Sequence, residues 1–145
     1  MTGAARGMTE THRLEVRPSL DDLGRVRDFI EASAGAADLA ADRIGELVLA
    51  VDEAVSNIVM HGGAPDAGRI EIRVLRGPDE VLVQIQDEGL PFDPTQADEQ
   101  HLGLSPLERE RPGGFGLNLI NRLVDRVDYR VGEDGRNELA LLKRR

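Results

Sequence analysis

Two alternating stretches on either side of Gly77-Pro78-Asp79 constrain the fold more than any other part of the chain. Both stretches carry apolar residues at every second position, a period that predicts β-strands with one covered face. The Gly-Pro-Asp segment predicts a hairpin turn between them. The apolar positions are Ile70, Ile72 and Val74 in the first stretch, and Val81, Val83 and Ile85 in the second. A hairpin of this kind needs a second layer that covers its apolar face.

Apolar residues at helical spacing predict that this second layer is made of helices. Ser19 and Asp38 are the expected N-caps of the first two helices, with Asp22 in the capping-box position of the first. The predicted elements are a strand at 12–18, helices at 19–36, 38–61 and 113–127, and two strands around a turn at 132–135. This order predicts a two-layer α/β sandwich with a mixed, largely antiparallel sheet covered on one face by helices. The alternating βαβ units of a Rossmann sheet are absent from the pattern.

Composition narrows the classes of function that the chain can have. The 145 residues fit one domain, and the formal net charge of -9 argues against binding of DNA or RNA, which usually needs a basic patch. The chain contains no cysteine, which is typical of a reducing compartment, and no apolar run of membrane-spanning length. We therefore expect a soluble, cytoplasmic protein without a nucleic-acid or membrane partner. The polar stretch 1–11 is expected to be a disordered tail.

A chemical stripe lies on the longest predicted helix, in the segment LAVDEAVSNIVMHGG. Glu53, Asn57 and His61 follow one another at intervals of four residues, so their side chains lie along one helix face beside an apolar face. A carboxylate, an amide and an imidazole in line can bind a metal ion and a polar ligand. The alternative is an exposed helix face that carries these residues by chance.

A second candidate site lies at the end of the hairpin, in the segment DEGLPFD. Asp87 follows Val81, Val83 and Ile85 in step, so its carboxylate should point toward the covered face, where it needs a partner. Gly89 has no side chain and lets a flat group approach the backbone. An aspartate at such a position can accept a hydrogen bond from the exocyclic amine of adenine. The alternative is an ordinary turn after a strand.

A third candidate site is the glycine cluster of the segment GGFGLNLI, at the start of the last predicted helix. Gly113, Gly114 and Gly116 would leave free amides at the positive end of the helix dipole, which attracts phosphate. The alternative is a flexible entry into the helix. The irregular stretch from Leu90 to Pro112 precedes this cluster, and a loop of this length is usually a functional lid or disordered.

Together and in this order, the three segments resemble the nucleotide-binding boxes of the Bergerat-fold ATPases, which include histidine kinase catalytic domains. The chain is most similar to the bacterial anti-sigma factor serine kinases. In this resemblance ELVLAVDEAVSNIVMHG is the N-box, and DEGLPFD and GGFGLNLI are the two glycine boxes. The similarity covers nearly all of residues 12–145, which are therefore expected to form one histidine kinase-like ATPase domain.

The resemblance implies ATP and Mg²⁺ as cofactors and assigns a role to each motif residue. Asn57 would hold Mg²⁺ against the phosphates, Asp87 would bind the adenine amine, and Glu53 would be the general base for a serine of a protein substrate. Further nucleotide contacts are implied for His61, Gly89, Phe92, Gly113, Gly114, Gly116 and Leu117. In a late strand, Arg136 and Asn137 stand where some relatives have a threonine near the nucleotide, so adenine contacts from that end stay open.

The resemblance also implies partners. The expected function is an ATP-binding anti-sigma regulator that phosphorylates a STAS-type anti-anti-sigma factor and binds a sigma factor as a homodimer. Arg25 and Arg27 on the first helix are a candidate surface for the sigma factor, although arginines on a helix are usually only solvated. Arg109 and Arg111 either reach a phosphate or pair with the neighbouring glutamates. The alternative function is an ATP-dependent interaction switch that binds another regulatory partner without phosphotransfer.

Overall fold

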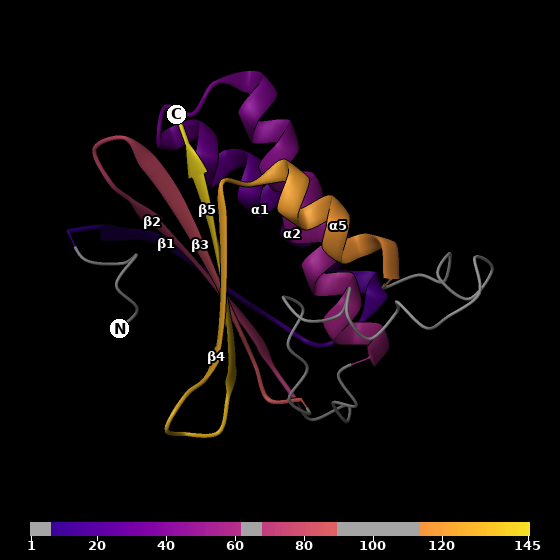
Figure 1. Ribbon diagram of the computed structural model, residues 1–145. Helices are drawn as coiled ribbons and strands as arrows, with labels where there is room; N and C mark the ends of the chain where they lie inside the picture. The colour runs from indigo at the N-terminus through magenta and orange to yellow at the C-terminus, as the bar shows by residue number, and fades with distance from the viewer. Residues whose placement is uncertain (1–6, 62–67, 90–113) are drawn as a thin grey trace.

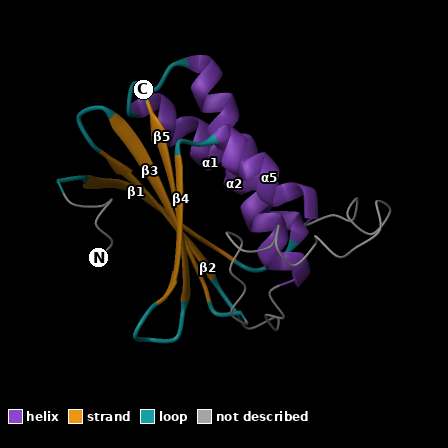
Figure 2. Cartoon of the chain, in the orientation of Figure 1, coloured by secondary structure: helices purple, strands orange, loops and turns teal. Residues whose placement is uncertain are grey.

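The computed structural model describes residues 7–61, 68–89 and 114–145. Its elements are β1 (Thr9–Val16), the 3-10 helix η2 (Leu20–Asp22), α1 (Leu23–Ala36), α2 (Ala41–His61), β2 (Ile70–Arg76), β3 (Glu80–Asp87), α5 (Gly114–Leu123), β4 (Arg126–Val131) and β5 (Asn137–Arg144). The described strands form one sheet in the order β1-β2-β3-β5-β4. The described helices α1, α2 and α5 lie together on one face of this twisted sheet (Figures 1 and 2). The predicted two-layer α/β sandwich is therefore confirmed.

The sheet differs from the prediction in one respect. All of the described strand pairs, β1 with β2, β2 with β3, β3 with β5 and β4 with β5, are antiparallel. The sheet is thus antiparallel throughout these strands rather than mixed. A short turn connects the two strands of each hairpin, β2–β3 and β4–β5. The two hairpins are joined through β3 and β5, which also pair antiparallel.

The core lies between the helices and the sheet. Alternating residues of β2, β3 and β5 face the helices and are fully or almost fully buried, among them Ile72, Val83 and Leu141. Val51 and Val55 of α2 are equally buried against them. The predicted apolar faces of the hairpin and of the long helix therefore meet, which explains why these segments form these elements.

The N-terminal strand is longer than its pattern indicates. β1 begins at Thr9, so residues 9–11, assigned above to a tail over 1–11, belong to the sheet, where they lie along β2. Most β1 side chains are exposed, because this strand lies at the edge of the sheet. Backbone pairing with β2, rather than burial of side chains, accounts for its extent.

The ends of the first two helices also depart from the prediction. Ser19 caps as expected, accepting from the Asp21 amide at 3.2 Å, but it caps η2 rather than a regular α-helix. The Asp22 carboxylate accepts from the Arg17 amide rather than completing a capping box. Asp38 does not cap α2: it has a φ of 62° and follows α1, where the Leu39 amide donates to the Ala34 carbonyl. This bond is the Schellman pattern that closes a helix.

The sheet face away from the helices carries charged side chains beside a small apolar cluster. Glu71 forms ion pairs with Arg13, Arg73 and Arg136. The hydrogen bonds that Arg13 donates to Glu10, together with the charge of Glu10, raise the pKa of the Arg13 guanidinium. The apolar cluster consists of Leu75, Leu82, Ala140 and Leu142, with Met8 packed against it. Among the described residues, no helix has the length and apolar character needed to cross a membrane.

Candidate functional site

The long helix α2 presents two of the three predicted stripe residues in different environments. Asn57 is buried, with 7% of its surface exposed, whereas Glu53, one turn earlier, is partly exposed. No described residue hydrogen-bonds to the Glu53 carboxylate or pairs with it. The neighbouring Asp52 differs, because its carboxylate accepts from Arg27 of α1 at 2.8 Å. Asp52 therefore ties α2 to α1, whereas the partly exposed Glu53 carboxylate has no partner in the described part of the chain.

The Asn57 amide has an unsatisfied polar group. Its Nδ2 atom is buried and has no hydrogen-bond partner among the described residues. A buried amide without a partner costs about 1–3 kcal/mol, and native proteins contain few such groups. Rotation of the amide by 180° exchanges its donor and acceptor ends, so this position can present either end to a ligand. The orphaned group points to a ligand site rather than to a packing role.

The end of β3 is held by a compact set of hydrogen bonds around Asp87. As predicted from its parity, Asp87 is buried, and its Oδ1 accepts from the Gly89 amide at 2.9 Å, a local turn that aspartate favours. Asn137 of β5 donates from Nδ2 to the same Oδ1 at 3.0 Å and to the Gly89 carbonyl at 3.1 Å. Tyr129 of β4 donates to Asn137 Oδ1 at 2.7 Å. Three strands thus fix the Asp87 carboxylate.

Asn137 and Tyr129 were not assigned a role by sequence reasoning. Asn137 lies directly opposite Asp87 in the β3–β5 ladder, and both side chains are buried. The sequence marks this position only as one where some relatives carry a threonine. The pairing of strands that are far apart in the sequence, which local patterns do not reveal, brings this amide to the site.

The three motifs gather at one end of the molecule. The last turn of α2, the end of β3 and the first turn of α5 all point toward the end of the molecule at the lower right of Figure 1. Gly114 is the first residue of α5, followed in the first turn by Gly116 and Leu117, so the expected glycine-rich helix start is confirmed. His61 is the last residue of α2. The predicted contacts Phe92 and Gly113, and the loop residues Arg109 and Arg111, lie outside the described residues.

The donor set suits Mg²⁺ better than a metal held by protein ligands alone. Among the described residues, no three His, Cys, Asp or Glu side chains cluster where they could hold a metal ion. Mg²⁺ usually binds to one or two protein oxygens together with substrate phosphates and water. A single buried amide at Asn57 fits that pattern.

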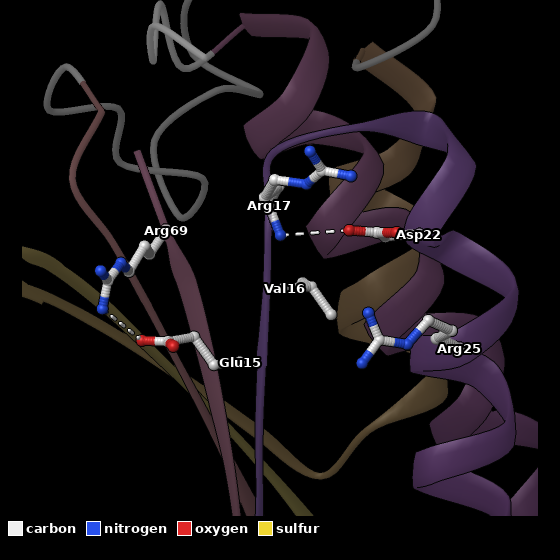
Figure 3. A pocket seen from close by; sticks show the side chains of 6 residues that line it. All are labelled: Glu15, Val16, Arg17, Asp22, Arg25 and Arg69. Atoms are coloured by element: carbon white, nitrogen blue, oxygen red, sulfur yellow. Dashed lines mark hydrogen bonds and ion pairs between the residues drawn. The ribbon is translucent and has the colours of Figure 1, made fainter. Parts of the chain in front are cut away.

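A polar pocket of about 240 Å³ lies beside the end of β1 and the start of α1 (Figure 3). It is lined by Glu15, Val16, Arg17, Asp22, Arg25 and Arg69. Arg69 pairs with Glu15 at 3.3 Å, whereas the side chains of Arg17 and Arg25 form no ion pair with any described residue. Of the two arginines predicted as a partner surface, Arg27 is thus engaged by Asp52, whereas Arg25 is exposed and pairs with no carboxylate of the described segments.

A family model described as the histidine kinase-like ATPase domain matches residues 16–143, a range that includes the ends of α2, β3 and α5 described above. The chain belongs to the histidine kinase-like ATPase family. The family description names an ATPase domain, and the matched range contains the three motifs that the sequence predicts to bind a nucleotide. The predicted resemblance is thereby confirmed.

Three relatives of this ATPase domain carry names that agree with the predicted branch. The serine/threonine-protein kinase BtrW of Bordetella bronchiseptica is 40% identical over 98 residues, which cover 66% of this chain and 66% of BtrW. The serine-protein kinase RsbW of Listeria monocytogenes serotype 4a is 33% identical over 122 residues, 81% of this chain and 76% of RsbW. An anti-sigma F factor of Thermoanaerobacter sp. (strain X514) is 28% identical over 102 residues, 70% of this chain and 71% of that protein. The ATPase domain therefore has serine-protein kinases among its relatives.

A solved structure supports the fold independently. The crystal structure of the RsbU and RsbW domains of Rv1364c from Mycobacterium tuberculosis matches with a TM-score of 0.64 at 22% sequence identity, over 92% of this chain and 32% of that chain. At this identity the likeness establishes the fold alone. It agrees with the sheet and the layer of described helices in this ATPase domain.

Proposed function

We propose that the chain is a cytoplasmic anti-sigma regulator that binds ATP with Mg²⁺ and phosphorylates a serine of a STAS-type anti-anti-sigma factor. The observation that carries this proposal is the buried Asn57 amide with its unpartnered Nδ2, one turn after the open carboxylate of Glu53. A carboxylate and a ligand-seeking amide at this spacing suit phosphoryl transfer, which needs a base for the hydroxyl and a metal at the phosphates. The names of the relatives support the same activity.

Glu53 is the proposed catalytic residue. Its carboxylate accepts the proton of the substrate serine as the serine oxygen forms a bond to the γ-phosphorus, and the bond from that phosphorus to the leaving ADP oxygen breaks. Asn57 is the proposed Mg²⁺ ligand. Mg²⁺ neutralises negative charge on the phosphates when it is bound. Glu53 is partly exposed, so a protein substrate can reach it from outside the domain.

The remaining motif residues are proposed to bind ATP. Asp87 accepts from the adenine amine, and Gly89 leaves space for the base. The amides at the start of α5 receive the phosphates. The other proposed contacts are His61, Phe92, Gly113, Gly114, Gly116 and Leu117.

The proposed protein partners are a sigma factor and the anti-anti-sigma substrate. Arg25, whose guanidinium is not engaged by a described carboxylate, is a better candidate for the sigma-factor surface than Arg27. Its pocket partner Arg17 adds a second positive charge for an acidic segment. We propose that the sigma factor binds a homodimer of the chain.

The proposal is tested by comparing Glu53→Gln with Asp52→Asn. Both variants replace a carboxylate by its isosteric amide on adjacent positions of α2, but Asp52 is occupied by Arg27. We expect Glu53→Gln to lower the rate of serine phosphorylation about 10²–10⁴-fold, the usual effect of losing a general base, with ATP affinity unchanged. Asp52→Asn should keep both the rate and the affinity within about threefold, because it retains a hydrogen bond to Arg27.

Each outcome of this comparison is informative. Phosphorylation that survives in Glu53→Gln would refute its assignment as the base. Wild-type protein that binds MgATP and its partner but transfers no phosphate would refute the kinase and favour the alternative, an ATP-dependent interaction switch. The readout is transfer of labelled γ-phosphate to a STAS-domain protein, with calorimetry for nucleotide affinity.

A further inference from the structure

We propose that Asn137 and Tyr129 form a positioning pair that holds Asp87 as a hydrogen-bond acceptor for the 6-amino group of the nucleobase. This inference rests on the proposed ATP site and adds residues that are not among its predicted contacts. Neither residue needs to touch the base: both act through Asp87.

The geometry begins with the two hydrogens of the Asn137 amide. Nδ2 lies 3.0 Å from Asp87 Oδ1 and 3.1 Å from the Gly89 carbonyl, so one amide group bridges the side chain and the backbone of the turn after β3. Asn137 is 4% exposed and Asp87 is 6% exposed. In such a buried setting, these bonds define the position of the carboxylate more strictly than water could.

The hydrogen-bond partners of Asn137 fix which way its amide faces. The Tyr129 hydroxyl donates to Asn137 Oδ1 at 2.7 Å from the neighbouring strand β4. If the amide were reversed, its oxygen would face the Asp87 carboxylate and the Gly89 carbonyl, an arrangement of acceptors without a donor. These two acceptors therefore select the orientation in which Asn137 donates to Asp87, and the Tyr129 hydroxyl satisfies Asn137 Oδ1 in that orientation.

The pair has a consequence for nucleobase recognition. The bonds from Gly89 and Asn137 both end on Oδ1, which holds the Asp87 carboxylate in place as a hydrogen-bond acceptor. The Asp87 carboxylate can accept a hydrogen bond from the 6-amino group of adenine. A 6-oxo purine would instead place a second acceptor against this carboxylate, without a hydrogen between them. Because both N–H groups of Asn137 Nδ2 are already donated, to Asp87 Oδ1 and to the Gly89 carbonyl, Asn137 has no donor left for a 6-oxo group. The pair thus favours 6-aminopurines.

The test combines a change in the protein with a change in the nucleotide. ATP is compared with purine riboside triphosphate, which lacks only the 6-amino group, by calorimetry with Mg²⁺. Asn137→Ala should weaken ATP binding about tenfold, the effect of removing one hydrogen bond to a charged group, and change binding of the purine riboside triphosphate less than about twofold. Tyr129→Phe should weaken ATP binding about threefold, and Asn137→Thr, which keeps a donor, should recover most of the loss. Glu138→Gln is the control on the same strand.

A second readout needs no nucleotide. Hydrogen exchange of the Gly89 amide, followed by NMR in the free protein, should become faster in Asn137→Ala, because the turn loses the bond to its carbonyl. It should not change in Glu138→Gln. Unchanged exchange in Asn137→Ala would overturn the positioning role.

The binding experiment separates failure of this inference from failure of the proposed function. Equal weakening of both nucleotides in Asn137→Ala would overturn the inference, since it would indicate a general structural effect. An unchanged ATP affinity would overturn it as well. By contrast, an absence of phosphoryl transfer with the predicted difference between the nucleotides would refute the kinase and leave the positioning pair supported.

Discussion

Replacing Asn57 by leucine should make the nucleotide-free protein more stable while abolishing its binding of MgATP. The amide is 7% exposed, and its Nδ2 has no partner among the described residues. A site that binds a ligand often carries such a cost in the free protein. Leucine has the same number of side-chain heavy atoms and the same branching, needs no hydrogen bond and favours the helix.

The expected gain in stability of Asn57→Leu has two contributions. Removing an unsatisfied buried amide should contribute about 1–3 kcal/mol, and the higher helix propensity of leucine adds a few tenths of a kcal/mol, roughly 0.4. We therefore expect the free energy of unfolding to rise by about 1–3 kcal/mol and Tm by about 3–10 °C. MgATP affinity should fall at least about 100-fold, because an apolar side chain cannot bind the metal.

The assay is urea unfolding followed by far-UV circular dichroism, since the chain has no tryptophan and one tyrosine. Ser56→Ala, on the adjacent position of the same helix, is the control: it should gain only about 0.5 kcal/mol from helix propensity and leave binding intact. A loss of more than about 1 kcal/mol in Asn57→Leu would refute the reasoning, because it would mean that the amide stabilises the free protein.

Two further predictions concern stability away from the site. Lys143→Met should lower the free energy of unfolding by about 1–2 kcal/mol in the same assay, because the buried ammonium donates to Glu46 and to the Leu123 carbonyl at the end of α5. Glu46→Gln leaves the bond to Leu123 in place, so it should lower the free energy of unfolding by less than half as much. Gly135→Ala should lower the free energy of unfolding by about 1 kcal/mol, because the residue has a φ of +83°, whereas an added Cβ would meet nothing within 4 Å. Gly135→Asn should lower it less, since asparagine tolerates a positive φ better than alanine. An equal loss of stability in both variants would contradict a purely backbone origin.

Local periodicity predicted those elements whose side chains have one buried face. The hairpin of β2 and β3 and the stripe of α2 repeat at two and at about 3.6 residues, so their buried faces could be read directly. The parity of Asp87 with Val83 and Ile85 also predicted its burial correctly. These predictions depend only on neighbours along the chain.

Interactions between distant segments set the features that the sequence alone did not predict. Asp38 is a good N-cap by type, yet the contact of Leu39 with Ala34 and an ion pair with Arg76 place it after α1. The first three residues of β1 form a strand because β2 offers a free edge. Asn137 lies beside Asp87 only because β5 pairs with β3.

The most direct test of the central claim is calorimetric titration of the wild type and Asn57→Ala with ATP, with and without Mg²⁺. We expect the wild type to bind ATP in the micromolar range, and this binding to require both Mg²⁺ and Asn57. Binding that is equally tight in Asn57→Ala, or that ignores Mg²⁺, would contradict the assignment of this amide to the metal. An absence of binding by the wild type under all conditions would contradict the proposed nucleotide site itself.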